Sequence, residues 1–255
     1  MLTLLHEDPF THRAFYKPRK YAGDAVMLDY IYGQEDYWPL PECTALGKQI
    51  FDYTTLAPAS AGVRARRGYI ADVLDLAAFE TTRPHVLSIA SGHFREAEMS
   101  AAIRRRRFGR VVALDADPQS LNEVETRYGR YGVETIAEPL MSLLKGTVDA
   151  GRFDLIYSLG LFDYLNEKIG RRLVTKAFEM LRPGGRLIVA NFLPGIHDIG
   201  YMEAIMDWKL IYRTRQEMIG MTLDIPEEEI QSVALESEEN NNIIFMTIRR
   251  KNEIK

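Results

Sequence analysis

The most informative stretch of this sequence is Val86-Leu87-Ser88-Ile89-Ala90-Ser91-Gly92-His93-Phe94-Arg95-Glu96. The apolar residues at its start predict a buried strand from Val86 to Ala90, and the small residues Ala90-Ser91-Gly92 predict a tight turn after it. We expect a helix to follow from about Arg95 to Arg105. A strand, a turn and a helix in this order begin a βαβ unit, and ligands of such units bind beside the turn.

Apolar runs alternate with helical patterns along the chain that follows. Further strands are expected at Arg110 to Leu114, Val133 to Ala137, Phe153 to Ser158 and Arg186 to Asn191. One helix is expected at Gln119 to Tyr128. A second is expected before Arg182-Pro183-Gly184-Gly185, which would end it, and its apolar face comprises Ile169, Leu173, Val174, Ala177, Phe178 and Leu181. Strands separated by helices predict a parallel sheet with helices on both faces.

The two ends of the chain break this alternation. Residues 1–82 have helical period, with helices expected at Tyr21 to Tyr32 and along the face formed by Val63, Ile70, Val73, Leu74 and Ala77. Near the other end, strand-like stretches at Ser232 to Glu238 and Ile243 to Arg249 flank an Asn-rich turn that is typical of a hairpin. The sequence predicts an α/β fold with an N-terminal helical cap in residues 1–82. In residues 83–255 it predicts a ligand-binding sheet closed by an antiparallel C-terminal hairpin.

The composition excludes several classes of function. The chain has 255 residues, of which 46% are hydrophobic and 27% charged, as in ordinary globular proteins. Its single cysteine and the spacing of its histidines offer no metal site. A net charge of -4 argues against nucleic acid as a partner. No apolar run is long enough for stable membrane insertion and the start is not a secretory signal, so we expect a cytoplasmic protein.

The turn around Gly92 is a poor match for a dinucleotide-binding loop. That loop needs three glycines in the pattern G-x-G-x-x-G, and the three positions hold Ala90, Gly92 and Arg95 here. Glu96 also places a carboxylate in the first turn of the helix, where a phosphate needs positive charge. A cationic ligand fits better, although stabilisation of the helix N-terminus explains Glu96 equally well. A nicotinamide oxidoreductase is therefore disfavoured.

Acidic residues follow the next two strands. Asp115 and Ala116 end the second strand about twenty positions after Gly92, where a carboxylate can accept hydrogen bonds from both hydroxyls of a ribose. The alternative is that Asp115 is a turn residue and Asp117 an ordinary N-cap. After the third strand, Glu138-Pro139-Leu140 is placed to flank an adenine ring. These residues predict a nucleoside site at the carboxyl edge of the sheet.

The fourth strand and the residues after it make the pattern specific. The stretch is Phe153-Asp154-Leu155-Ile156-Tyr157-Ser158-Leu159-Gly160-Leu161-Phe162-Asp163-Tyr164-Leu165, and Leu181-Arg182-Pro183-Gly184-Gly185 and the hairpin follow it. Together with the turn and Asp115, this set resembles the class I S-adenosylmethionine-dependent methyltransferases over residues 83–250. The resemblance implies a Rossmann-like seven-stranded sheet, S-adenosylmethionine as cofactor and S-adenosylhomocysteine as product.

The resemblance also implies a cofactor site. The residues that it places around S-adenosylmethionine are Tyr21, Asp24, Ala90, Ser91, Gly92, Glu96, Asp115, Ala116, Glu138, Pro139, Leu140, Ser158, Leu159 and Gly160. The first turn departs from the family pattern, because Ser88 stands where an acid is common, and Ala90 and Phe94 stand where glycines are common. These departures concern the contacts of the turn rather than the fold.

Three motifs narrow the resemblance. Phe15 to Met27, Gly160 to Tyr164 and Asp207 to Thr214 are similar to a bacterial subgroup that includes the methyltransferase making 3-hydroxypalmitic acid methyl ester. The segment Tyr16 to Met27 is expected to form a lid over the cofactor, with Tyr21 and Asp24 where the subgroup concentrates its pattern. A packed helical cap without ligand contact is the alternative.

Candidate catalytic residues follow the fourth and fifth strands. Asp163 and Tyr164 are expected to face the transferred methyl group, with Asn191 beside them and Tyr16 above them in the lid. A buried capping role explains Asp163 equally well.

An acceptor pocket is expected after the fifth strand. Tyr201, Ile205, Trp208 and Tyr212 would share one face of a helix above the strand ends, with Arg213 or Lys17 pairing with a carboxylate of the acceptor. An ordinary core stripe is the alternative.

The sequence therefore predicts an S-adenosylmethionine-dependent methyltransferase for a small-molecule acceptor, such as a carboxylate or hydroxyl of a fatty-acid-like compound or secondary metabolite. One rival is an enzyme that cleaves or cyclises S-adenosylmethionine and releases methylthioadenosine. Another is a module that binds S-adenosylmethionine without turnover. The sequence leaves the acceptor atom open and is compatible with a homodimer.

Overall fold

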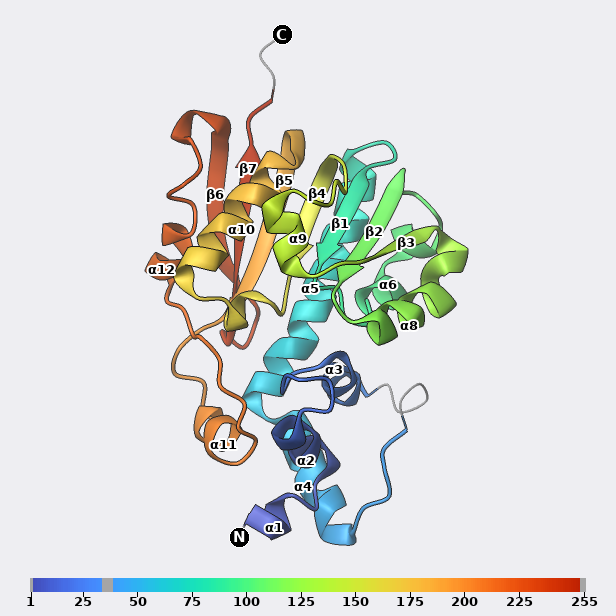
Figure 1. Ribbon diagram of the computed structural model, residues 1–255, viewed down its shortest axis with the longest axis vertical. Coiled ribbons are helices and arrows are strands. Elements are labelled where there is room, and N and C mark those ends of the chain that lie inside the picture. Colours follow the sequence, from blue (N-terminus) through green and yellow to red (C-terminus); the bar gives the residue numbers. More distant parts are fainter. Residues whose placement is uncertain (1, 34–38, 253–255) are drawn as a thin grey trace.

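The protein forms a seven-stranded sheet in the order β3-β2-β1-β4-β5-β7-β6 (Figure 1). Its computed structural model describes residues 2–33 and 39–252, so residues 1, 34–38 and 253–255 of the expected domain ranges lie outside the description. The strands are β1 (His85–Ile89), β2 (Arg110–Asp115), β3 (Val133–Ala137), β4 (Phe153–Ser158), β5 (Leu181–Phe192), β6 (Ile230–Ser237) and β7 (Ile243–Arg250). Strands β1 to β5 are parallel, and β7 is antiparallel to β5 and β6. The expected α/β sheet with an antiparallel C-terminal hairpin is confirmed.

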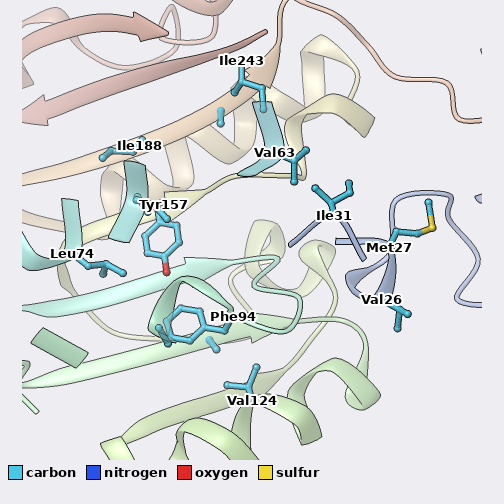
Figure 2. Close-up of a cluster of buried hydrophobic side chains, with 14 of the residues drawn as sticks. Val26, Met27, Ile31, Val63, Leu74, Phe94, Val124, Tyr157, Ile188 and Ile243 are labelled. Carbon is cyan, nitrogen blue, oxygen red and sulfur yellow. The ribbon is translucent and has the colours of Figure 1, made fainter. Parts of the chain in front are cut away.

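Helices cover both faces of the sheet. One face packs against α5 (Pro58–Glu80), α6 (Glu96–Met99), α7 (Ala101–Arg104) and α8 (Pro118–Tyr128). The other packs against α9 (Leu140–Lys145), α10 (Glu167–Glu179) and α12 (Arg215–Gly220). Short 3-10 helices lie at Gly129–Tyr131, Phe162–Tyr164 and Glu227–Glu229. In Figure 2, Tyr157 and Ile188 of the sheet and Leu74 of α5 belong to the buried cluster on the first face.

An N-terminal cap lies at the carboxyl ends of the parallel strands (Figure 1). It contains α1 (Leu2–Leu5), α2 (Pro9–Tyr16), α3 (Ala25–Tyr32) and α4 (Ala45–Leu56), and α11 (Ile199–Ala204) lies beside it. Helix α5 runs from the cap onto the sheet, where Ile70 and Leu74 are buried in the core. The expected division into a cap and a sheet domain between residues 82 and 83 stays a prediction. Helix α5 packs against both of these parts.

The helix expected from Arg95 to Arg105 is two short helices. Ser100 has an extended backbone and separates α6 from α7. Asp75 of α5 stabilises this break, because its carboxylate accepts hydrogen bonds from Ser100 Oγ at 2.5 Å, Ala101 N at 3.1 Å and Ala102 N at 2.9 Å. The periodicity of the sequence did not reveal the break, since a capping carboxylate from a distant helix supplies it.

Other expected boundaries also shift. Helix α10 ends at Glu179, and β5 begins at Leu181. The residues Arg182 to Gly185, which were expected to end the helix, therefore lie within β5, where its pairing with β4 is irregular. The helix expected from Tyr21 begins at Ala25, because Asp24 caps it. Helices α9 and α12 were not expected.

The helix expected through Tyr201 and Arg213 is wrong beyond Ala204. Asp207 adopts a left-handed backbone with φ 47°, and the chain continues without regular structure to Arg213. Tertiary hydrogen bonds replace the helical ones, since Trp208 N donates to Met202 O at 2.8 Å and Arg213 N donates to Phe192 O at 3.0 Å.

A buried ion pair joins the cap to the first turn. Asp29 of α3 accepts hydrogen bonds from Arg95 Nε at 2.7 Å and Arg95 Nη2 at 2.8 Å, and its Oδ2 lies 2.7 Å from His93 Nδ1. Burial alone would raise the pKa of Asp29, but the hydrogen bonds from Arg95 and His93 hold it below its ordinary value. On the outer side, Arg19 Nη1 donates to Asp117 Oδ2 at 3.0 Å.

We expect the Asp29→Ala variant to lose about 3–5 kcal/mol of unfolding free energy, because the substitution leaves the buried Arg95 guanidinium without its main partner. Urea unfolding followed by circular dichroism measures the loss. The matched control is Asp52→Ala, which removes the exposed ion pair with Lys48 and should cost less than about 1 kcal/mol. Equal losses in the two variants would contradict the assigned importance of the buried pair.

Candidate functional site

Three residues of the turn after β1 have the left-handed backbone that favours glycine, although only one of them is a glycine. Ala90, Gly92 and Phe94 have φ values of 56°, 53° and 55°, all in the left-handed region. A side chain at Gly92 would also lie 3.3 Å from Cβ of Ala25 in the cap. Two of these three left-handed positions, Ala90 and Phe94, therefore hold residues other than glycine. Ser91 is half-buried and its N–H donates to Leu114 O.

Asp115 organises the strand ends around this turn. Its carboxylate accepts hydrogen bonds from Gly92 N at 2.8 Å and Asp117 N at 2.9 Å. Glu138 N donates to the backbone oxygen of Asp115 at 3.0 Å, which brings the end of β3 to the same edge. Burial raises the pKa of Asp115. Asp115 thus has the turn-organising role considered as an alternative, at the place expected for a ribose.

The side chains beyond β2 and β3 differ in exposure. Ala116 and Pro139 are exposed, whereas Glu138 and Leu140 are half-buried. Asp117 caps α8, as its carboxylate accepts a hydrogen bond from Gln119 N. These residues lie at the carboxyl edge of the sheet, where an adenine ring was expected.

Glu96 is directed into the protein. It is buried, and its Oε1 accepts a hydrogen bond from the hydroxyl of Tyr157 at 2.7 Å. Burial raises the pKa of Glu96 and also that of Tyr157. Glu96 therefore joins α6 to β4, a structural role that differs from both the expected proximity to a cationic ligand and the alternative of stabilising the helix N-terminus.

The end of β4 holds two buried polar atoms without a hydrogen-bond partner among the described residues. They are Ser158 Oγ and Nε of Arg66, a residue of α5. Arg66 Nη1 donates to Leu159 O at 2.6 Å, and a side chain at Gly160 would lie 3.5 Å from Arg66 Nη2. Sequence reasoning missed Arg66, although its spacing from Val63 and Ile70 places it on the buried face of the expected helix.

Part of the expected lid reaches the strand ends. The rings of Tyr21 and Tyr164 lie 6.3 Å apart, and Trp208 Nε1 donates to Tyr164 Oη at 2.8 Å. A side chain at Gly23 would lie 2.4 Å from the Trp208 ring. Burial, followed by the charges of Asp115 and other carboxylates, raises the pKa of Tyr21. This group closes one side of the strand-end region.

The other two expected lid residues have different surroundings. Asp24 is fully buried, caps α3 through Val26 N and Met27 N, and accepts two hydrogen bonds from Arg13. Tyr16 is 63% exposed, packs on the ring of His12 and borders a hollow lined only by cap residues. The structure does not bring these two side chains to the strand ends.

Asp163, Asn191 and Arg213 form a buried group after β4 and β5. Asp163 accepts a hydrogen bond from Phe192 N at 2.8 Å, and burial raises its pKa to about 6 against the opposing effect of nearby arginines. Arg213 Nη1 donates to Asn191 Oδ1 at 2.5 Å and to Phe162 O at 2.6 Å, and Nη2 donates to Leu165 O.

Arg213 therefore holds the chain in place and does not present its guanidinium to an acceptor carboxylate, as had been expected. Lys17, the other candidate for that role, instead pairs with Asp207 at the surface between the cap and the segment after α11.

A cavity of about 160 Å³ lies between the cap and the end of β5. Its lining is mainly apolar and includes Ile31, Val63, Phe192, Met206 and Trp208, with Asp198 and His197 among its polar residues. Tyr201 and Trp208 of the expected pocket line it, although only Tyr201 is helical; Ile205, Tyr212 and Arg213 do not. No group of metal-ligating side chains occurs within residues 2–33 and 39–252.

Comparison with known proteins adds a family to these features. Residues 71–185 match the family model described as "Methyltransferase domain". No curated protein sequence matches the chain. The matched residues run from the second half of α5 to the start of β5 and include the first turn, Asp115 and the end of β4.

Several solved structures share the fold. A possible exported protein from Bordetella parapertussis aligns with a TM-score of 0.70 and 16% identity, over 89% of this chain and 79% of that one. An O-methyltransferase family protein from Burkholderia thailandensis aligns at 0.57 and 15%, over 92% and 73%. N-methyltransferase NodS from Bradyrhizobium japonicum WM9, in complex with S-adenosylhomocysteine, aligns at 0.53 and 15%, over 87% and 98%.

Residues 71–185 therefore match a methyltransferase domain, and the chain shares the fold of solved methyltransferases. The expected fold and enzyme type, a methyltransferase, are confirmed, and S-adenosylmethionine as the cofactor belongs to the proposed function. The bacterial subgroup and the individual site residues stay predictions. Within the described ranges, none of the helices has both the length and the apolar composition needed to cross a membrane.

We expect Asp163→Asn to remove a pH dependence of stability. A carboxyl with a folded pKa of about 6 binds protons that the unfolded chain releases, so the wild-type unfolding free energy falls as pH rises from about 4 to about 6. Asparagine still accepts the hydrogen bond from Phe192 N and does not titrate. As pH rises through this range, the unfolding free energy of the variant minus that of the wild type should therefore increase by up to about 3 kcal/mol. Urea unfolding at a series of pH values measures this difference. A difference that is independent of pH would contradict the raised pKa.

Proposed function

We propose that this protein transfers the methyl group of S-adenosylmethionine to a small molecule whose apolar part occupies the cavity at the end of β5. The observation that carries this proposal is the mainly apolar cavity between the cap and the strand ends, with Phe192 and Trp208 in its walls. A cavity of this size accommodates a group of about the size of benzene. Room for an acceptor favours transfer over cleavage or cyclisation of the cofactor.

The residues at the strand ends fit the cofactor. Asp115 lies at a strand end where an acid can bind a ribose, and in this proposal the adenine lies near Glu138 and Leu140 at the neighbouring strand end. The partnerless Ser158 Oγ and Arg66 Nε leave polar groups for the amino-acid part. S-adenosylmethionine supplies an activated methyl group when bound, and its transfer requires an acceptor held in line and shielded from water.

In this proposal the protein mainly orients the acceptor and handles its proton. Tyr21, Tyr164 and Trp208 exclude water on the cap side. In this proposal Asp163 is the base for an acceptor hydroxyl, because it accepts a hydrogen bond from the backbone of Phe192, which lines the cavity, and its pKa of about 6 leaves the carboxyl ionised but basic at neutral pH. An acceptor carboxylate would need no base, so acceptor chemistry decides whether Asp163 titration affects turnover.

Calorimetric titration and product analysis test the activity. We expect S-adenosylhomocysteine to bind and to accumulate when the enzyme is incubated with S-adenosylmethionine and a panel of medium-chain carboxylic and hydroxy acids. Release of methylthioadenosine without S-adenosylhomocysteine would favour cleavage of the cofactor. Binding without any product across the panel would favour a sensing module.

A larger side chain in the cavity should reduce use of the acceptor and leave the cofactor unaffected. Val63 is buried and lines the cavity, so Val63→Phe should fill part of it and lower kcat/KM for the accepted compound by about 10-fold or more. Coupled detection of S-adenosylhomocysteine measures this change. Calorimetry should find that the Kd of the variant for S-adenosylhomocysteine differs from the wild-type value by less than about 2-fold. Val63→Ile, which adds one methylene group, is the matched control. Unchanged kcat/KM in a folded Val63→Phe enzyme would place the acceptor elsewhere.

A further inference from the structure

Arg66 is a buried cation at the carboxyl end of β4. Its side chain extends from α5, and the residue is 3% exposed. Its Nη1 donates to Leu159 O at 2.6 Å, and its Nη2 lies 3.5 Å from the position of a side-chain carbon on Gly160. The guanidinium therefore borders the backbone that follows β4, where ligands of parallel sheets bind.

The charge of Arg66 is not paired within the described protein. No Asp or Glu oxygen of residues 2–33 and 39–252 lies within 4.0 Å of its guanidinium, and Nε is buried without a hydrogen-bond partner. A guanidinium carries five N–H donors, and buried charges are normally ion-paired. Arg95 satisfies this rule through Asp29, whereas Arg66 donates one hydrogen bond to a neutral carbonyl.

The nearest carboxylates already have other partners. Burial raises the pKa of Glu96 and of Asp163, and the positive charge of Arg66 opposes this increase in both. However, Glu96 accepts a hydrogen bond from the Tyr157 hydroxyl, and Asp163 accepts one from Phe192 N. Neither forms an ion pair with Arg66, so the guanidinium keeps its capacity for an additional anion.

The order of the strands indicates which anion this is. Along the sheet edge, β3, β2, β1 and β4 are consecutive neighbours. If adenine lies near Glu138 after β3 and the ribose near Asp115 after β2, the remaining part of the cofactor crosses the turn after β1. It then arrives at Gly160 after β4. That remaining part is an amino acid, which ends in a carboxylate.

We propose that Arg66 binds the α-carboxylate of the methionine part of S-adenosylmethionine. This inference rests on the proposed function. A planar guanidinium can donate two parallel hydrogen bonds to a carboxylate, and such pairs are strong in a site that excludes water. The bound carboxylate would accept a hydrogen bond from Nε of Arg66, which has no partner among the described residues, and would neutralise the buried charge of the guanidinium. Arg66 also connects the cofactor to α5, whose Val63 lines the acceptor cavity.

Calorimetry with two ligands tests the proposal. S-adenosylhomocysteine carries the carboxylate, and its decarboxylated analogue S-adenosyl-3-thiopropylamine keeps the rest of the molecule. We expect the wild-type protein to prefer S-adenosylhomocysteine by about 10-fold or more. Arg66→Gln should abolish this preference by weakening S-adenosylhomocysteine alone, with the affinity for the analogue changed by less than about 2-fold. Arg66→Lys should retain part of the preference, because it keeps the charge without the planar fork.

The controls separate this inference from the proposed function. Arg186→Gln removes a partly buried arginine at the opposite end of the sheet and should leave both affinities unchanged. If the wild-type protein binds neither nucleoside, the proposed function fails. If Arg66→Gln weakens both ligands equally, or neither, carboxylate recognition by Arg66 is wrong. An increase in acceptor KM with unchanged nucleoside binding would assign Arg66 to an acceptor carboxylate and overturn the proposal. Arg66→Lys provides the same comparison of ligands if Arg66→Gln does not fold.

Discussion

The buried ion pair between Asp29 and Arg95 is the interaction on which the arrangement of the site depends. It fixes α3 of the cap against the first turn, on the edge of the sheet where ligands bind. Between the ion-paired Arg95 and His93, Phe94 adopts a left-handed backbone and buries its ring. Strain of about 1–3 kcal/mol at such a residue persists only where its surroundings hold it. This explains how the turn keeps a glycine-like conformation without the glycines.

Burial also determines the electrostatics of the strand ends. Burial raises the pKa of Glu96, Asp115 and Asp163, because each carboxyl group gives up hydration on folding. Arg66 adds one buried positive charge among them. A ligand with a sulfonium, an ammonium and a carboxylate would complement this mixture better than a pyrophosphate, which would bring only negative charge. The charge balance thus agrees with S-adenosylmethionine, the cofactor of the proposed function.

The sequence was sufficient for the sheet because its signals are local. Buried apolar runs and intervening helical periods predicted β1 to β5, and Asp115 could be located from its distance to Gly92. The errors lie where distant residues decide local structure. Asp75 breaks a helix at Ser100, and Phe192 replaces a helical partner for Arg213. The helical spacing of Arg66 places it on the buried face of α5, but its hydrogen bond to Leu159 after β4 is a tertiary contact that no local pattern encodes.

The contacts around the site constrain how ligands enter. On one side, Asp29 and Arg19 hold the cap to the first turn and to α8 through buried or partly buried ion pairs. On the other side, the cap meets the segment after α11 through the packing of Gly23 on Trp208 and the exposed pair of Lys17 with Asp207, and such exposed pairs contribute little. Arg213 fixes the far end of that segment. Trp208 itself is buried, packs edge-on against Phe10 of α2 and donates a hydrogen bond to Tyr164 Oη. These contacts also join the cap to the segment after α11. Because Trp208 also lines the cavity, the proposed acceptor site and the group formed with Tyr164 at the end of β4 share this side chain as a wall.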